Sequence, residues 1–442
     1  MRMFRNRIVV NAIAVWGRGL LTLVLGIFSS RWALQAVGAE GYGLWALCCS
    51  VNFFACFAQG IVANATQRFL SIAVGDGSWR ATYRRIVRVH FISASATLLV
   101  TAPISFWLIG NWLTVPAERV HECQLVMVWV FVFAYAAMIN TPNRQLFAAH
   151  QRLVEPALWG IFLTLQAFGI LAWMVTHPGR WLVPYAASLA GSVIMTEICL
   201  CLRARHLFAP GRPAADDVRA PAPASVGEIL RFSFWRMFSD GGATLSSYGM
   251  TILVNRLFGA VETGAAGLAR SAANQTNSLT FAVASAYEPA LANEAGAKGE
   301  LAGLTRRACL RLTGAYLLFA VPFFCLAERI LALWLGDPPA GTVVAVRWLL
   351  IAGAFSAFGQ AFMLAVAASG RVRALYLGCG LLQAGGVLLA LGFFRAGVFG
   401  GGLGSVFSAV ALANGLGAGW AVICYLRGRK AQAGAAVPMT EA

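Results

Sequence analysis

Residues 8–30 read IVVNAIAVWGRGLLTLVLGIFSS, an apolar stretch that carries a single charge, Arg18. A helix needs about 20 apolar residues to cross the roughly 30 Å hydrocarbon layer of a bilayer. The apolar region of a signal peptide is shorter, about 7–15 residues. We therefore interpret this stretch as an uncleaved first transmembrane helix.

Eleven further stretches of comparable length and apolarity follow along the chain. The predicted spans are 8–30, 42–64, 89–110, 123–142, 156–176, 182–202, 232–255, 264–287, 312–333, 348–368, 375–394 and 403–426. The composition agrees, because 59% of the 442 residues are hydrophobic, 12% are charged and the mean hydropathy is +0.71. Soluble domains carry about 25% charged residues. The sequence predicts an all-α integral membrane protein with twelve transmembrane helices.

The positive charge of the chain is placed between the predicted spans. The formal net charge is +17, and most Lys and Arg residues fall in alternate connecting segments. In a soluble protein this excess would favour nucleic acid, whereas short clusters between apolar spans indicate membrane topology and contact with anionic lipid headgroups. We expect both termini to be cytoplasmic and no nucleic-acid partner.

The two halves of the chain repeat each other. The motif Gly38-Ala-Glu-Gly-Tyr-Gly43 returns 221 residues later as Gly259-Ala-Val-Glu-Thr-Gly264. Arg84-Arg85 correspond in the same way to Arg306-Arg307, and the segment 148–152 corresponds to 367–371. Six spans per half give parallel repeats, and such repeats commonly enclose a substrate site. We expect a six-helix lobe over 1–206, a cytoplasmic Pro/Ala-rich linker over 207–227, a second six-helix lobe over 228–430 and a cytoplasmic tail over 431–442, with a central cavity between the lobes.

The seventh predicted span carries a regular series of polar residues. They are Ser233, Arg236, Asp240, Thr244, Ser247, Thr251 and Asn255. Their spacing of three or four residues places them on one face of an α-helix. Packing against another helix would explain the hydroxyl groups, and a structural ion pair would explain Arg236 with Asp240. A ligand-binding role is the alternative, because ionisable groups inside a membrane are costly and usually functional.

Other predicted spans also present polar faces. Arg18 shares a helical face with Asn11 and Thr22, Arg270 shares one with Asn274 and Asn277, and Gln59 lies seven residues after Asn52. Carboxylates well inside the spans, away from the span ends, are few, namely Asp240 and Glu197. The cavity would therefore be net cationic, and arginine binds phosphate well because its donors fork onto two oxygens. The sequence predicts a two-lobed transporter for an amphiphilic anion.

No enzymatic or metal-binding pattern emerges from the sequence. The ten cysteines include no CxxC pair, the five histidines are scattered, and the segment 400–404 lacks the lysine of a phosphate-binding loop. The loops on the outer side are short. We expect no catalytic residue, no metal site and no cofactor.

The first third of the chain resembles a known transporter family. The residues are Asn11, Gly17-Arg18, the run GAEGYGLWA over 38–46, Gln67-Arg68 and Gly75-Asp76, together with the Arg152 motif. This pattern is similar to that of the Wzx-type polysaccharide flippases of the multidrug/oligosaccharidyl-lipid/polysaccharide exporter superfamily, whose fold is shared with the MATE drug exporters.

The resemblance implies a monomeric protein of the bacterial inner membrane that flips an undecaprenyl-pyrophosphate-linked oligosaccharide for O-antigen, capsule or exopolysaccharide assembly. It implies alternating access coupled to H⁺ or Na⁺, and a polysaccharide polymerase and a chain-length regulator as partners. Arg18, Arg236 and Arg270 would hold the pyrophosphate, with Asp240 beside them. Asn255, Asn274, Asn277 and Gln59 would contact the sugar. A drug exporter of the same fold and a membrane glycan polymerase or ligase are the alternatives.

Overall fold

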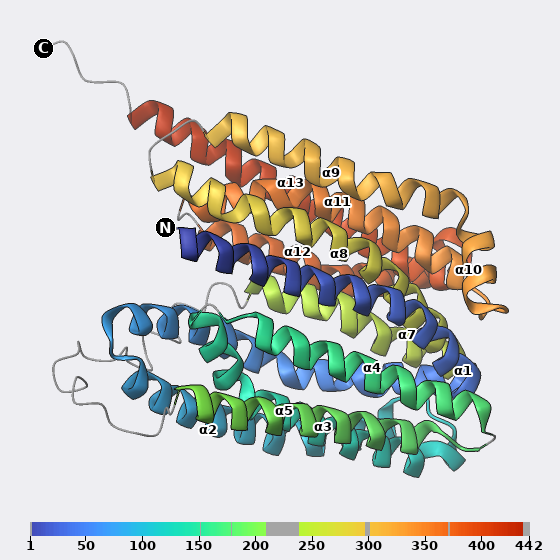
Figure 1. Cartoon of the computed structure of the whole chain (residues 1–442). Coiled ribbons are helices and arrows are strands. Elements are labelled where there is room, and N and C mark those ends of the chain that lie inside the picture. The colour runs from blue at the N-terminus through green and yellow to red at the C-terminus, as the bar shows by residue number, and fades with distance from the viewer. Residues whose placement is uncertain are drawn as a thin grey trace, which may run out of the picture. The chain divides into compact units, whose positions relative to one another are not determined.

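In the computed structural model, the described residues are 2–150, 152–177, 179–208, 238–296, 301–369 and 372–435, and all the regular elements in these ranges are helices (Figure 1). The longer helices are α1 (Arg2–Asp76), α2 (Trp79–Trp107), α3 (Val120–Ala149), α4 (Val154–Thr176), α5 (Leu182–Phe208), α7 (Met250–Phe258), α8 (Ala260–Gly296), α9 (Leu301–Cys325), α10 (Ala327–Leu335), α11 (Thr342–Ala368), α12 (Val372–Arg395) and α13 (Leu403–Ala435). Short π or 3-10 turns lie at η1 (Leu108–Trp112), η2 (Ala117–Arg119), η4 (Leu245–Gly249) and η5 (Val398–Gly401).

Many of these helices have the length and apolarity of membrane spans. Within the described ranges, nine helices meet both criteria, and every predicted span overlaps a helix. Large apolar side chains on them are widely exposed, for example Leu99 at 77% and Leu388 at 75%. Apolar surface exposed along so many long helices is typical of a surface that faces lipid. The chain is therefore a multi-pass membrane protein.

The longest helix, α1, is two transmembrane helices joined at a glycine. Gly38 interrupts it with φ 73° and ψ 170°, a backbone conformation that side chains with a Cβ rarely adopt. Its repeat equivalent Gly259 also has a positive φ, 93°, and separates α7 from α8. The repeated motif thus encodes the same break in both halves.

The helices form two compact units, as the contacts between Cα atoms show. One unit comprises Met1–Phe234 with Asn255–Gly264, and the other comprises Trp235–Val254 with Ala265–Ala442. In the first unit α3 packs along α5 and α1, and in the second α13 packs against both α11 and α12 (Figure 1). The short segment Asn255–Gly264, which the sequence placed in the second lobe, packs with the first unit. Most of the predicted linker and of the tail lies outside the described residues.

Two equivalent glycines of the repeated motif meet backbone to backbone within the first unit. A Cβ on Gly43 would lie 1.8 Å from the carbonyl oxygen of Ala260, and a Cβ on Gly264 would lie 2.6 Å from that of Ala39. Ala39 and Ala260 are themselves repeat equivalents. The two motifs therefore make reciprocal contacts, the arrangement that a local twofold axis produces.

Most predicted spans differ from the observed helices at their ends, and two of them show why. The fourth, predicted over 123–142, extends to Ala149 because Pro142 is accommodated inside α3, as membrane helices allow when neighbours satisfy the freed backbone. The ninth, predicted over 312–333, begins at Leu301 and ends at Cys325, and α10 follows after a break at Leu326. Apolarity alone does not locate a helix end, because the chain on both sides of the break is apolar.

The polar series of the seventh span does not stay on one face. Residues 238–244 are α-helical, but η4 is a π-helical turn. A π turn contains one more residue than an α turn and rotates all later side chains relative to the earlier ones. Ser247 is exposed, whereas Thr251 and Asn255 are 1% and 0% exposed. The prediction of a continuous polar stripe is therefore wrong for its second half.

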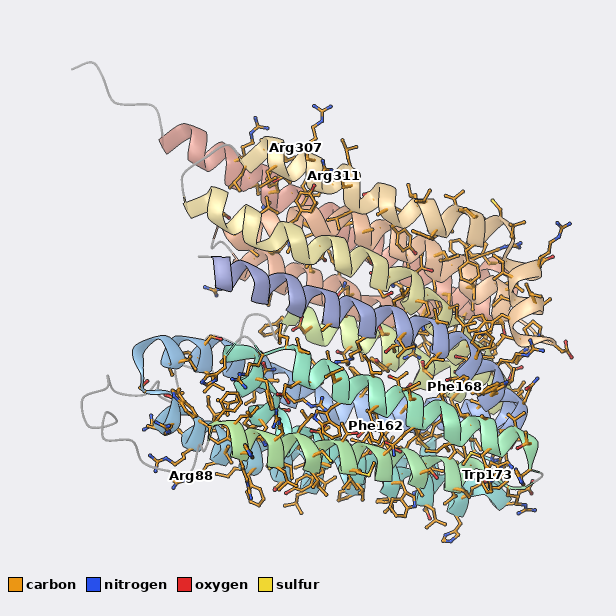
Figure 2. All side chains as sticks on the ribbon, in the orientation of Figure 1. Arg88, Phe162, Phe168, Trp173, Arg307 and Arg311 are labelled. Atoms are coloured by element: carbon orange, nitrogen blue, oxygen red, sulfur yellow. The ribbon has the colours of Figure 1, made fainter. Side chains whose placement is uncertain are left out.

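In Figure 2, Arg88 and Trp173 lie at opposite ends of the first unit, which also contains a compact aromatic cluster. The ring of His150 lies 5.2 Å from Trp79 and 4.4 Å from Phe208. Burial lowers the pKa of His150, against the opposing effect of its hydrogen bond to the Leu146 carbonyl. The His150 ring therefore packs here between aromatic side chains, in surroundings that disfavour its protonated form.

Candidate substrate site

The first predicted ligand residue, Arg18, lies along α4. A Cβ on Gly160 would fall 2.6 Å from Arg18 Nε, so the glycine leaves the space that the guanidinium occupies. One turn further along both helices, the hydroxyls of Thr22 and Thr164 are 3.4 Å apart. Arg18 is exposed, and no hydrogen bond or ion pair joins it to the side chains that the structure describes. Its donors are therefore available to a ligand.

A buried polar network that the sequence did not predict spans three helices of the same unit. Arg144 of α3 forms an ion pair with Glu197 of α5, whose carboxylate also accepts a hydrogen bond from the Asn140 amide. That amide also donates to the Glu197 carbonyl at 2.9 Å. Asn143 donates to Asn140, and the Tyr83 hydroxyl of α2 donates to Asn143 at 2.5 Å. The network neutralises the Glu197 carboxylate.

Arg144 belongs to the candidate site because of its charge. It lies close enough to Arg18 for the two guanidiniums to repel each other. Glu197 balances one of these positive charges, so the three groups together carry a net charge of +1. The predicted fourth span ends at residue 142, so Arg144 fell in the connection after it. The sequence did contain a signal for this network: the polar series Asn140, Asn143 and Arg144 in an apolar helix, together with the carboxylate of Glu197 in another helix.

The other predicted charged residues belong to the second unit. The guanidinium of Arg270 lies 4.7 Å from the centre of the Tyr248 ring, a cation–π geometry. Asp240 is half-buried, and its carbonyl accepts a hydrogen bond from Thr244 at 2.7 Å. Arg236 lies outside the described residues. Convergence of Arg18, Arg236 and Arg270 on one site stays a prediction.

The predicted sugar-binding amides have separate environments. Asn274 is exposed. Asn277 is half-buried, and its Oδ1 would lie 3.0 Å from a Cβ on Gly353 of α11. The side chain of Gln59 lies outside the part that the structure describes. Asn274 and Asn277 therefore remain candidates, with Asn274 the more accessible.

Asn255 is not available to a ligand. It is completely buried, its Oδ1 accepts the backbone N–H of Thr114 at 3.0 Å, and its Nδ2 donates to the Thr114 carbonyl at 3.2 Å. The π turn before α7 directs this side chain to the loop after α2. Predicting a sugar contact for Asn255 was therefore wrong, and the residue fixes a loop instead.

Asn255→Ala is expected to destabilise the protein by about 1–3 kcal/mol. The reason is that the N–H and carbonyl of Thr114 would both lose their buried partner. The shift of the thermal unfolding midpoint in detergent measures this effect. Asn274→Ala, at an exposed position, is the matched control. An equal midpoint for both variants would contradict the assigned role of Asn255.

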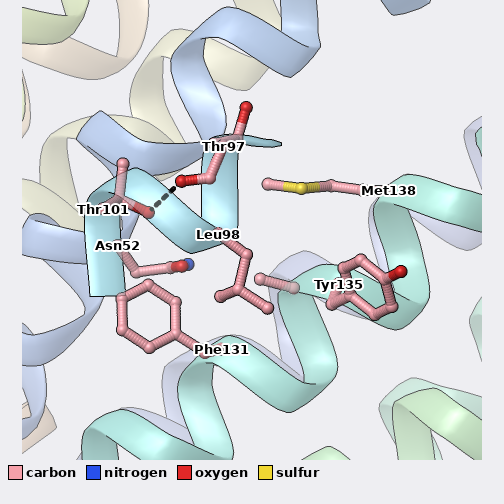
Figure 3. A pocket seen from close by; sticks show the side chains of 8 residues that line it. Asn52, Thr97, Leu98, Thr101, Phe131, Tyr135 and Met138 are labelled. Atoms are coloured by element: carbon pink, nitrogen blue, oxygen red, sulfur yellow. Dashed lines mark hydrogen bonds between the residues drawn. The ribbon is translucent and has the colours of Figure 1, made fainter. Parts of the chain in front are cut away.

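A small cavity between α1, α2 and α3 is not a substrate site. Its empty volume is about 190 Å³, and it is lined by Asn52, Thr97, Leu98, Thr101, Phe131, Ala134, Tyr135 and Met138 (Figure 3). Its threonines are bound to each other, since Thr101 donates to the Thr97 carbonyl at 2.7 Å. The space inside it that a water molecule could occupy is about 10 Å³, far below the roughly 300 Å³ of small-ligand pockets. Within the described ranges, no three His, Cys, Asp or Glu side chains gather as a metal site.

Comparison with known proteins places the fold. No known family model and no curated protein matches the chain. A mutant of the MATE transporter VcmN from Vibrio cholerae matches with 15% identity and a TM-score of 0.64, covering 96% of this chain and 98% of that one. Lipid II flippase MurJ, in an inward closed conformation, matches with 10% identity and a TM-score of 0.69, covering 95% and 89%.

An inward-facing multidrug resistance MATE family transporter of the MOP superfamily matches with 14% identity and a TM-score of 0.66, covering 96% of this chain and 98% of that one. Each match extends over nearly the whole of both chains, although the identities are low. The predicted MATE-like fold is thereby confirmed: this chain has the two-unit, all-helical fold shared by MATE transporters and MurJ.

Proposed function

We propose that this protein flips a polyprenyl-pyrophosphate-linked oligosaccharide from the cytoplasmic to the periplasmic leaflet of the bacterial inner membrane. The observation that carries the proposal is the exposed guanidinium of Arg18 in a membrane helix, in the same unit as Arg144, whose charge the Glu197 carboxylate balances. An excess of positive charge at this depth is costly unless an anion binds there. The fold is also that of a lipid II flippase.

The proposed site combines charge with amide groups. Arg18, Arg236 and Arg270 hold the pyrophosphate, while Asn274, Asn277 and Gln59 bind sugar hydroxyls and the lipid tail stays in the bilayer. Asp240 follows Arg236 by four residues in the sequence and belongs to the same proposed site. Rocking of the two units alternates access, driven by H⁺ or Na⁺. The protein acts as a monomer with both termini cytoplasmic, and a polysaccharide polymerase and a chain-length regulator use its product.

Arg18→Ala tests the proposal directly. We expect surface glycan to fall about tenfold or more at an unchanged protein level, because one charge-assisted hydrogen bond contributes about 1.5–3 kcal/mol. The measurement is glycan export in cells whose only copy carries the substitution, with membrane protein quantified in parallel. Arg18→Lys keeps the positive charge but cannot donate to two phosphate oxygens in the forked geometry of arginine. Its glycan export should therefore lie between that of the wild type and that of Arg18→Ala. Unchanged export in Arg18→Ala would remove the proposed site.

Gly160→Ala is a second test of the role of Arg18, in which Arg18 itself is not substituted. The new Cβ meets only the flexible end of Arg18 and displaces the guanidinium. Gly169→Ala on the same helix meets nothing within 4 Å and is the matched control. Both substitutions gain about 1 kcal/mol of helix propensity, so a lower export in Gly160→Ala alone isolates the position of Arg18.

The same fold is also consistent with an exporter of organic cations, since MATE transporters are among the matched structures. That function predicts uptake of a cationic dye into proteoliposomes against a proton gradient, unaffected by Arg18→Ala. Dye uptake without glycan export would decide for the exporter.

A further inference from the structure

The two partners of the Arg144–Glu197 ion pair are unequally exposed. The side chain of Glu197 is 5% exposed, whereas that of Arg144 is 42% exposed. Glu197 is therefore almost completely enclosed by the protein, while part of the Arg144 guanidinium faces outward. An arginine carries five N–H donors, and one carboxylate cannot use them all.

Arg144 retains unused binding capacity. Its Nε is buried and has no hydrogen-bond acceptor among the described residues. Its contact with Glu197 uses Nη2. Arg18 is close enough to repel it, although the pair with Glu197 holds Arg144 in place. The outward part of the Arg144 guanidinium, in the same unit as the exposed Arg18, therefore gains stability when a multivalent anion enters.

We propose that Arg144 and Arg18 together bind the diphosphate group of the substrate, and that Glu197 holds Arg144 as an internal competitor while the site is empty. This inference rests on the proposed function and adds Arg144 as a ligand-binding residue. When diphosphate binds, a phosphate oxygen takes donors of Arg144, and Glu197 keeps the amide of Asn140. The ligand class is a diphosphate, either free or as the headgroup of a polyprenyl lipid.

Binding to the purified full-length protein tests the inference, with inorganic pyrophosphate and farnesyl diphosphate as separate calorimetric probes. Glu197→Gln removes the competing charge but keeps an acceptor for Asn140, so we expect affinity to rise about tenfold, the equivalent of about 1.4 kcal/mol. Arg144→Lys keeps a cation beside Glu197 but cannot fork, so we expect affinity to fall about tenfold. Glu197→Asp, which keeps the charge, should leave affinity nearer to the wild-type value than Glu197→Gln does.

The exposed ion pair between Arg203 and Glu155, with two contacts of 2.9 Å, supplies the matched control. Glu155→Gln changes the net charge of the same unit by the same amount and should leave diphosphate binding unchanged. If Glu155→Gln and Glu197→Gln changed the diphosphate affinity equally, the net charge of the protein would explain the effect, and the inference would be overturned.

The outcomes separate this inference from the proposed function. No binding of either probe by the wild type, or equal binding by the wild type, Arg144→Lys and Glu197→Gln, overturns the role of Arg144 even if glycan export depends on Arg18. Binding that responds to Arg144 and Glu197 as expected supports the diphosphate site even in a protein that exports no glycan. A preference for farnesyl diphosphate over inorganic pyrophosphate assigns the lipid headgroup as the source.

Discussion

Gly43→Ala is expected to destabilise the protein by about 3 kcal/mol, which is large for the addition of one methyl group. The new Cβ would lie 1.8 Å from the Ala260 carbonyl oxygen and 2.8 Å from its carbon. Both are backbone atoms and cannot rotate away, so the two helices must separate. Overpacking of this kind typically costs about 1–3 kcal/mol. The thermal midpoint and the monodisperse fraction after purification measure the loss.

The glycines of α1 supply the control. Gly19→Ala adds the same methyl group in the same helix but meets nothing within 4 Å. It should leave the midpoint unchanged or raise it. Gly264→Ala, which would approach the Ala39 carbonyl oxygen at 2.6 Å, should reproduce the loss in a milder form. A stable, well-folded Gly43→Ala protein would contradict the reciprocal contact of the two motifs.

Arg144→Leu is expected to be more destabilising than Glu197→Gln. Removing the cation leaves a carboxylate that is 5% exposed without its counterion, and breaking a buried ion pair in this way costs about 3–5 kcal/mol. Removing the carboxylate leaves a guanidinium that is 42% exposed and can still reach polar groups. Thermal unfolding of both variants in the same detergent should show this order.

The double variant Arg144→Leu with Glu197→Leu should recover most of the stability of the Arg144→Leu protein, because no uncompensated charge remains. Arg203→Leu, which breaks an exposed ion pair of the same chemistry, should change the midpoint little. If the double variant were as unstable as Arg144→Leu, the loss would come from packing and the charge argument would fail.

The apolar membrane helices and the glycine breaks of the repeat followed from the sequence because both depend on local patterns. Apolar runs long enough to cross a bilayer give the same helices in many tertiary arrangements. Repeated glycines such as Gly38 and Gly259 mark backbone breaks that only glycine tolerates easily. The ends of α3 and α9 did not follow, since they depend on how Pro142 and Leu326 pack.

The residues of the candidate site also differ in whether the sequence could predict them. The position of Arg18 in a membrane helix is local information, and its spacing from Asn11 and Thr22 was enough to single it out. Glu197 was visible as a rare intramembrane carboxylate. Its pairing with Arg144, 53 residues earlier, depends on α3 packing along α5. No helical periodicity connects residues on different helices.

The sequence by itself therefore determined that this is a duplicated helical membrane protein with arginine inside the bilayer, since length, apolarity and periodicity act within single helices. Only the tertiary structure decided which polar groups are used by the protein itself. Asn255 is occupied by a loop, Glu197 is occupied by Arg144, and Arg18 keeps its donors beside Gly160. The physical reason is that a polar group in a membrane must find a partner, and the packing of other helices determines which one is within reach.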